Sequence, residues 1–78
     1  MNTLTMAQVT AIYDAQAARY PSTVGQSLRT EVNAALQLSN PAPARGDGED
    51  PDDHYLRQKK HGKDLWVETA RLIAEAGL

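Results

Sequence analysis

Residues 65 to 78 read LWVETARLIAEAGL, and this stretch decides the fold class. Its apolar side chains recur every three or four positions, which places them on one face of an α-helix. That face consists of Leu65, Trp66, Thr69, Leu72, Ile73 and Ala76. Gly77 suits the left-handed conformation that ends many helices, and Leu78 can supply the hydrophobic contact of a Schellman motif. The stretch therefore predicts an amphipathic helix with a defined end.

The same helix is expected to begin near residue 52. Asp52 or Asp53 can cap it, because a carboxylate accepts hydrogen bonds from the free N–H groups of the first turn. Tyr55 and Gly62 prolong the apolar face towards the helix start. Two favourable i,i+4 ion pairs favour one continuous helix, Asp53 with Arg57 and Lys60 with Asp64. A break at Gly62, which would give two shorter helices, is the alternative.

Residues 5–20 also have helical spacing. Their apolar face comprises Met6, Val9, Ile12, Tyr13, Ala17 and Tyr20. Thr5 and Gln8 fit a capping box, in which the hydroxyl and the amide each satisfy a free backbone N–H group. Pro21 ends this helix, because proline disfavours helical geometry in the residue before it.

A further helix is expected from Ser22 or Thr23 to about Ser39, before Asn40-Pro41. Val24, Leu28, Val32, Ala35 and Leu36 form its apolar face, and Gln26, Arg29, Asn33 and Gln37 are assigned to the other side. No segment shows the two-residue alternation of a β-strand. The expected fold is therefore all-α. It is a small three-helix bundle, or a four-helix one if the chain breaks at Gly62, forming a single domain over residues 1–78.

Residues 40–53 differ in composition from the rest of the chain. They contain three prolines, two glycines and five acids, and no large apolar residue. Such a segment cannot anchor itself to a core. We expect a long, mobile acidic loop within the domain.

The composition predicts a thin core. Of 78 residues, 41% are hydrophobic, and 12 of those 32 are alanines, which leaves 20 larger apolar side chains. A domain of this size buries a small share of its surface and is marginally stable. Some of the apolar side chains are therefore expected to contact a partner, with aromatic residues the best candidates. The candidate contact residues are Trp66, Tyr55, Leu72, Ile73 and Tyr20.

Charge is unevenly distributed along the chain. The formal net charge is −2, which argues against a protein whose whole surface binds nucleic acid. Four basic residues nevertheless fall within residues 57–63 without an acid among them, namely Arg57, Lys59, Lys60 and Lys63. They can form a patch for phosphate or for an acidic partner, screened by the preceding acidic loop. The alternative is a solvated helix face, because these positions spread around much of the helix.

No motif in the chain indicates catalysis. A helix-turn-helix alignment on Gly62 puts charged residues at interior positions. His54 and His61 are too far apart on one helix to share a metal ion, and the chain has no cysteine. The carboxylates of residues 47–53 lie where water would keep their pKa values ordinary. We therefore expect no enzyme activity, no metal site and no cofactor.

The leading functional hypothesis is a small helical protein–protein interaction module. It would act as an adaptor, an inhibitor or an assembly subunit, binding a larger protein or a second copy of itself. The alternative is a nucleic-acid-associated regulator that uses the patch at residues 57–63. The chain shows no export signal and no apolar run long enough to span a bilayer, so a cytoplasmic protein without a membrane partner is expected. The alanine-rich composition favours a bacterial or phage accessory protein.

Overall fold

The computed structural model describes all 78 residues and is 71% helical, with three helices and no strand. The helices are α1 (Met6–Arg19), α2 (Val24–Ser39) and α3 (Pro51–Glu75). The all-α prediction is confirmed. Helix α3 runs without interruption through Gly62, so the four-helix alternative is wrong.

Helix α3 begins slightly earlier than the sequence predicted. Asp50 is the N-cap residue, and its side chain accepts a hydrogen bond of 2.8 Å from the backbone N–H of Asp52. Pro51 occupies the first helical position, where its missing N–H group costs nothing. Asp52 and Asp53 therefore lie inside the first turn and do not cap it. The loop between α2 and α3 is correspondingly shorter than residues 40–53.

The other helix ends largely follow the sequence. The capping box of α1 is confirmed: Gln8 N donates to Thr5 Oγ1 over 3.1 Å, and Thr5 N donates to Gln8 Oε1 over 2.8 Å. Thr23 is the N-cap residue of α2 but makes no capping hydrogen bond through its side chain.

The carboxyl end of α3 has the hydrogen bonds of a Schellman motif. Leu78 N donates to Ile73 O, and Gly77 N donates to Ala74 O, both over 3.1 Å. Gly77 has a φ of +73°, a conformation that side chains with a Cβ disfavour. The chain therefore turns sharply after α3.

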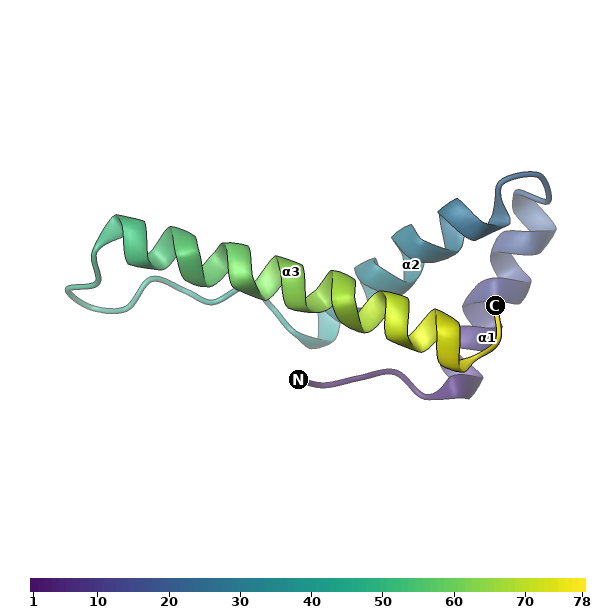
Figure 1. Cartoon of the computed structure of the whole chain (residues 1–78), viewed down its shortest axis with the longest axis horizontal. Helices are drawn as coiled ribbons and strands as arrows, with labels where there is room; N and C mark the ends of the chain where they lie inside the picture. The colour runs from purple at the N-terminus through teal and green to yellow at the C-terminus, as the bar shows by residue number, and fades with distance from the viewer.

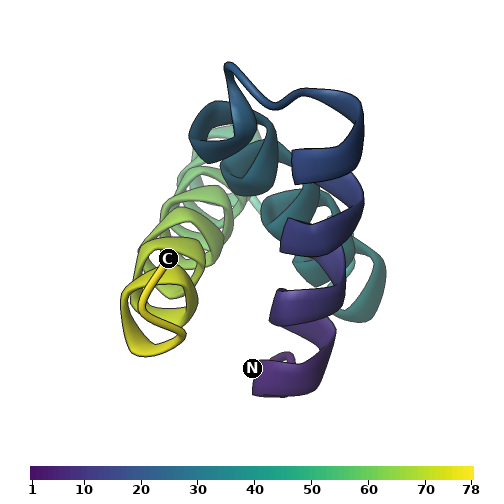
Figure 2. The same ribbon diagram turned by 90° about the vertical axis from the view of Figure 1, so that its right-hand side faces the viewer.

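Helix α2 is the central element of the fold, because it contacts both α1 and α3, which contact each other less (Figure 2). The interior lies where the three helices meet. Its buried apolar residues are Leu4, Val9, Leu28, Val32, Leu36, Leu65 and Leu72. Seven residues make a small core, as the composition predicted.

Polar side chains complete this interior. Asn33 is 2% exposed and Thr69 is 1% exposed. Asn33 Nδ2 donates to Thr69 Oγ1 over 3.3 Å, and Thr69 Oγ1 donates to Leu65 O over 2.8 Å. The assignment of Asn33 to the outer side of α2 is therefore wrong. Because α2 is covered on two sides, its buried arc is wider than its apolar stripe.

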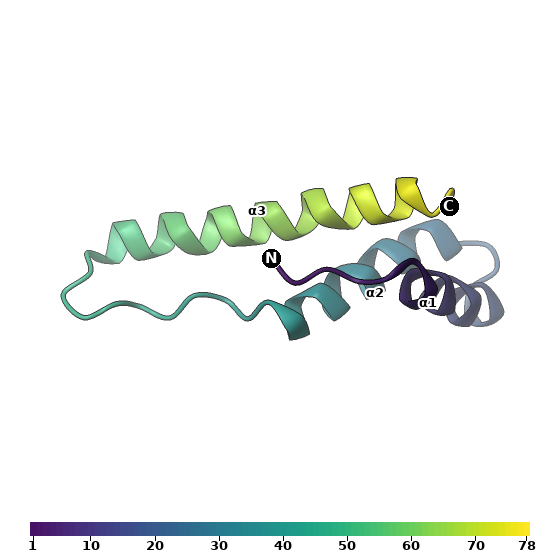
Figure 3. The same ribbon diagram turned by 90° about the horizontal axis from the view of Figure 1, so that it is seen from below.

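The molecule is elongated, with principal extents of 47 × 22 × 17 Å. Helix α3 has 25 residues and is about 37 Å long. Its first half extends past α1 and α2, and only the loop of residues 40–50 runs beside it (Figures 1 and 3). None of residues 51–62 is buried. Half of the longest helix therefore lies outside the core.

The first residues of the chain lie against α2 and α3. The backbone N–H of Asn2 donates to Asn40 Oδ1 over 2.8 Å, and Asn40 Nδ2 donates to the carbonyl of Asn2 over 2.7 Å. The hydroxyl of Thr3 donates to the carboxylate of Glu68. These contacts fix the segment that leads into α1. None of the three helices has the length and hydropathy needed to cross a membrane.

Candidate protein-binding surface

The candidate contact residues divide into exposed and internal ones. Trp66 is 52% exposed, Tyr55 is 60% exposed and Tyr20 is 46% exposed. Leu72 is 1% exposed and belongs to the core, and Ile73 is half-buried and packs against it. Leu72 is therefore unavailable to a partner, because α1 and α2 already cover that side of α3. Tyr20 lies at the end of α1, away from the two α3 aromatics, and its ring is 5.8 Å from the Arg19 guanidinium carbon.

A row of exposed side chains follows the outer side of α3. We call it the outer stripe, and it consists of Tyr55, Leu56, Lys59, Lys63, Trp66 and Val67. Its aromatic residues are separated by eleven positions, as are its two aliphatic ones, which is about three helical turns in each case. All four apolar members are more than half exposed. The stripe is therefore a straight aromatic and aliphatic surface with two lysines between its ends.

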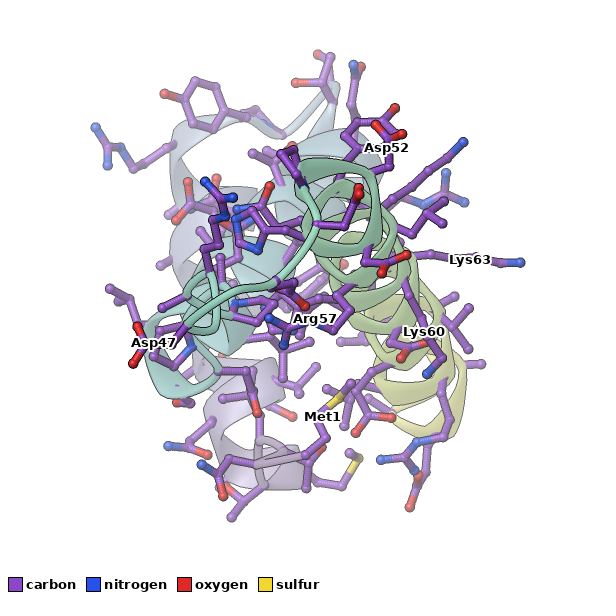
Figure 4. All side chains as sticks on the ribbon, turned by 90° about the vertical axis from the view of Figure 1, so that its left-hand side faces the viewer. Met1, Asp47, Asp52, Arg57, Lys60 and Lys63 are labelled. Carbon is purple, nitrogen blue, oxygen red and sulfur yellow. The ribbon has the colours of Figure 1, made fainter.

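The four basic residues predicted to form one patch fall into two groups, one paired with acids of the same chain and one unpaired. Arg57 is held by Glu49, and Lys60 Nζ lies 3.0 Å from Asp64 Oδ2, as the i,i+4 spacing predicted. Lys59 and Lys63 make no ion pair or hydrogen bond within the chain. Figure 4 shows Lys63 pointing away from the body and Arg57 pointing back towards the loop. The free positive charge of the patch is therefore that of the two stripe lysines.

Glu49 is the centre of a network that attaches the loop to α3. Arg57 donates from Nε and Nη2 to the two carboxylate oxygens of Glu49, over 2.6 and 2.7 Å, and also reaches the carbonyl of Ala44 over 2.9 Å. Gly46 N donates to the same carboxylate over 3.1 Å. These hydrogen bonds, first of all that from Arg57, lower the pKa of Glu49 to about 2, so the expectation of ordinary pKa values in residues 47–53 is wrong for Glu49. The expected pair of Asp53 with Arg57 does not form, because the loop brings Glu49 to Arg57.

His54 lies beside this network. Its Nδ1 is 3.4 Å from Glu49 Oε1 and has no hydrogen-bond partner. His61 lies two turns further along α3, among the residues that border the loop. No three histidine, aspartate or glutamate side chains are placed so that they could hold one metal ion together.

A second charged network lies on the last turns of α3, where Arg71 follows the stripe residue Val67 by one turn. Arg71 donates to Glu68 and to Glu75, and the Glu68 carboxylate also accepts from Thr3. The Arg71 hydrogen bonds are the main cause that lowers the pKa of Glu68 to about 2, and they raise the pKa of Arg71 itself. The charge of Arg71 is therefore neutralised within the chain, whereas the charges of Lys59 and Lys63 are not.

Two hollows continue the line of the stripe along the seam between α2 and α3. One, of about 250 Å³, is bordered by Arg29, Trp66, Thr69 and Ala70. The other, of about 780 Å³, is bordered by Arg29 again and by Tyr13, Leu28, Ile73 and Leu78 among others. Arg29 makes no ion pair within the chain. A third unpaired cation therefore lies next to Trp66.

The sequence reasoning missed Leu56, Val67 and Arg29 as members of this surface. Leu56 and Val67 follow the two aromatics by one position each and share their eleven-residue spacing, so a search for a second apolar row could have found them. Arg29 comes from another helix, and only the packing of α2 on α3 places it beside Trp66.

The chain matches no protein-family model, no curated protein sequence and no solved structure.

Proposed function

We propose that this protein is a protein-binding module that docks on its partner through the outer stripe of α3. The observation that supports the proposal is the exposure of Tyr55, Leu56, Trp66 and Val67 in one row on a helix that extends beyond the core. Tryptophan and tyrosine are over-represented among the residues that contribute most to protein–protein binding. A helix that presents such residues at regular spacing is suited to packing against a groove or another helix.

The position of the stripe supports the proposal as well. The half of α3 that carries Tyr55 and Leu56 has no helix packed on it, so a partner can approach without displacing the fold. Contact with a partner would bury apolar area that water now covers, which is favourable by roughly 25 cal/mol per Å². The shape of the molecule therefore leaves Tyr55 and Leu56 accessible.

Nucleic-acid binding is less well supported. Of the four basic residues predicted to contact phosphate, Arg57 and Lys60 are paired with acids of the same chain. Two lysines would release few counterions, and proteins that bind nucleic acid tightly make about 6–10 phosphate contacts. The net charge of −2 adds a general repulsion.

The test is affinity recovery from a lysate of the organism that carries the gene. The immobilised full chain is compared with Trp66→Ala and with Leu38→Ala. Leu38 is the matched control, because it is 86% exposed on α2 and lies outside the stripe. We expect wild type and Leu38→Ala to retain the same protein and Trp66→Ala to lose it, by tenfold or more if Trp66 contributes about 2 kcal/mol.

Circular dichroism of each variant shows whether the fold is kept. Recovery that is equal for all three proteins would place the binding elsewhere and overturn the proposal. The same holds if no protein is retained by wild type and light scattering finds no self-association.

A further inference from the structure

We propose that the partner surface is an acidic amphipathic helix, with carboxylates one turn apart that pair with Lys59 and Lys63. This inference rests on the proposed function and adds the chemistry of the partner. The cations of α3 differ in their surroundings. Arg57, Lys60 and Arg71 have acidic partners in the chain, and Lys59 and Lys63 have none.

The unpaired lysines lie within the apolar surface. Both occupy the outer stripe between Tyr55 and Trp66, so a partner that covers the aromatics also covers the lysine stems. Lysine is depleted at the centres of protein interfaces, because its ammonium group must lose water. Such a loss is compensated when a carboxylate of the partner lies opposite. A partner without acids at these positions would leave two ammonium groups partly desolvated and unpaired.

The geometry of the stripe favours a helix as the partner element. Tyr55 to Val67 spans about 18 Å along α3, which a helix of about 12 residues matches. The two lysines are four residues apart and therefore one turn apart on the same side. Acidic residues with i,i+3 or i,i+4 spacing on a partner helix have the same separation.

Arg29 extends this charge pattern across the seam. It borders both hollows, the smaller one beside Trp66 and the larger one beside Ile73. A partner helix that follows the stripe past Trp66 would bring its next turn to Arg29. The larger hollow, of about 780 Å³, is bordered by apolar residues such as Leu28 and Ile73 as well as by Arg29, and can receive a side chain from that turn.

A second copy of the chain fits this surface poorly. An antiparallel pair of α3 helices that opposes Tyr55 with Val67 and Leu56 with Trp66 also opposes Lys59 with Lys63. A parallel pair opposes each lysine with itself. Sliding the antiparallel pair until Asp52 faces Lys59 or Lys63 moves Trp66 beyond the first residue of the other helix, Pro51. Like charges at an interface are unfavourable, so the charges of the stripe select a different molecule.

The test is a selection from a displayed library of helical peptides. Each peptide carries a fixed apolar seam, and each flanking position is glutamate, glutamine or lysine. The full chain is the immobilised target, used as wild type, as Trp66→Ala, and as the double variant Lys59→Glu/Lys63→Glu. We expect wild type to enrich glutamate over lysine by roughly fivefold or more at flanking positions one turn apart. The double variant should reverse this preference.

A second measurement uses Trp66, the only tryptophan of the chain, as the reporter. A selected acidic peptide should shift its emission to shorter wavelength, and the peptide with glutamine in place of glutamate should bind more weakly. The difference should diminish with added salt, because exposed charge pairs are screened. If the charge-reversed variant fails to fold, the milder variant Lys59→Gln/Lys63→Gln takes its place. It should bind the glutamate and glutamine peptides equally.

The outcomes separate the inference from the proposed function. Peptides that depend on Trp66 but show no preference for glutamate would overturn the inference and leave the proposed function intact. Failure to select any Trp66-dependent peptide would count against both. An emission shift with phosphatidylglycerol vesicles as large as that with the acidic peptide would assign the surface to lipid. A molecular mass that doubles with concentration, and does not double in Trp66→Ala, would assign it to a second copy. Either of these last two results overturns the inference.

Discussion

The two halves of α3 belong to one helix but are held in place by different forces. Residues 63–75 contribute Leu65, Thr69 and Leu72 to the interior, whereas residues 51–62 contribute no buried side chain. The first half has an N-cap, a proline at its start and the Arg57–Glu49 contact with the loop. An isolated helix of about 12 residues is marginal in water. The first half therefore depends on continuity with the second.

Stability and binding depend on different sides of α3. The half that stabilises the fold buries Leu65 and Leu72 on one side and exposes Trp66 and Val67 on the other, whereas the half that extends past the core buries no side chain. Substitutions of side chains that α3 buries and of side chains that it exposes should therefore have different consequences.

The largest effect is expected in the core half. Leu72→Ala removes a side chain that is 1% exposed and should lower the free energy of unfolding by about 2–5 kcal/mol. Leu56→Ala makes the same chemical change at a residue that is 58% exposed, and should alter stability by about 0.5 kcal/mol or less. Urea unfolding followed by circular dichroism measures both. Equal losses would show that the two halves are equally packed.

Alanine substitution should have opposite effects on stability at Gly62, inside α3, and at Gly77, just after its end. Gly62→Ala should stabilise the protein by about 1 kcal/mol, because an added Cβ meets no atom within 4 Å and alanine is the better helix former. Gly77→Ala should destabilise it by about 1 kcal/mol, because the φ of +73° is costly for alanine. Thermal unfolding of both variants measures the effects. A loss of stability in Gly62→Ala would mean that α3 is not continuous there in solution.

Acid should weaken both charged networks. Glu49 and Glu68 have pKa values near 2 in the folded protein, below the ordinary value of 4.5. A carboxyl whose pKa is lower in the folded state stabilises that state above pH 4.5, and this contribution is lost as the pH falls from 4.5 to about 2. The urea midpoint should therefore fall over that range.

The variants Glu49→Gln and Glu68→Gln measure separately how much each network contributes to the loss of stability in acid. Each variant should show a flatter dependence of the urea midpoint on pH between 4.5 and 2. With Glu49→Gln, hydrogen exchange should become faster at the start of α3, and with Glu68→Gln near Thr3. An unchanged pH dependence in both variants would contradict the assignment of the lowered pKa values to these contacts.

The smallest effect is expected from Arg57→Gln. Removing this exposed pair should lower the thermal midpoint of unfolding only slightly, and by less than protonation of Glu49 does, because solvent screens the pair and Gly46 N still donates to Glu49. Hydrogen exchange at residues 52–56 should nevertheless become faster, since the loop loses its attachment to the first half of α3. Lys60→Gln, which breaks the neighbouring pair with Asp64, is the control and should not affect the loop. Slower or unchanged exchange in Arg57→Gln would show that the loop does not support this half.

Local rules predicted the helices well. The capping box at Thr5, the Gly77 end and the Lys60–Asp64 pair each depend on residues within about one helical turn, and each is confirmed. The sequence contains everything that these features require. The fold class follows from the same periodicity.

Contacts between elements could not be read in this way. Periodicity gives the direction of an apolar face but not the width of the arc that neighbouring helices cover. Asn33 and Gln16 are buried because α2 and α1 are covered beyond their apolar stripes, although Gln16, seven residues after Val9, could have been placed inside by spacing. Trp66 lies at the edge of the predicted apolar face of α3, beyond the arc that the other helices cover, and remains exposed. The pairing of Arg57 with Glu49 requires the path of a loop, which composition does not define.

The overhanging half of α3 also affects how the molecule moves through solution. Its radius of gyration is 14.7 Å, against about 11.5 Å for a compact chain of the same length. An elongated particle diffuses more slowly than a sphere of equal mass. On a gel-filtration column calibrated with spherical standards, the 8.5 kDa monomer would therefore elute early and resemble a larger species. Its mass in solution is best measured by light scattering or sedimentation equilibrium, which do not depend on shape.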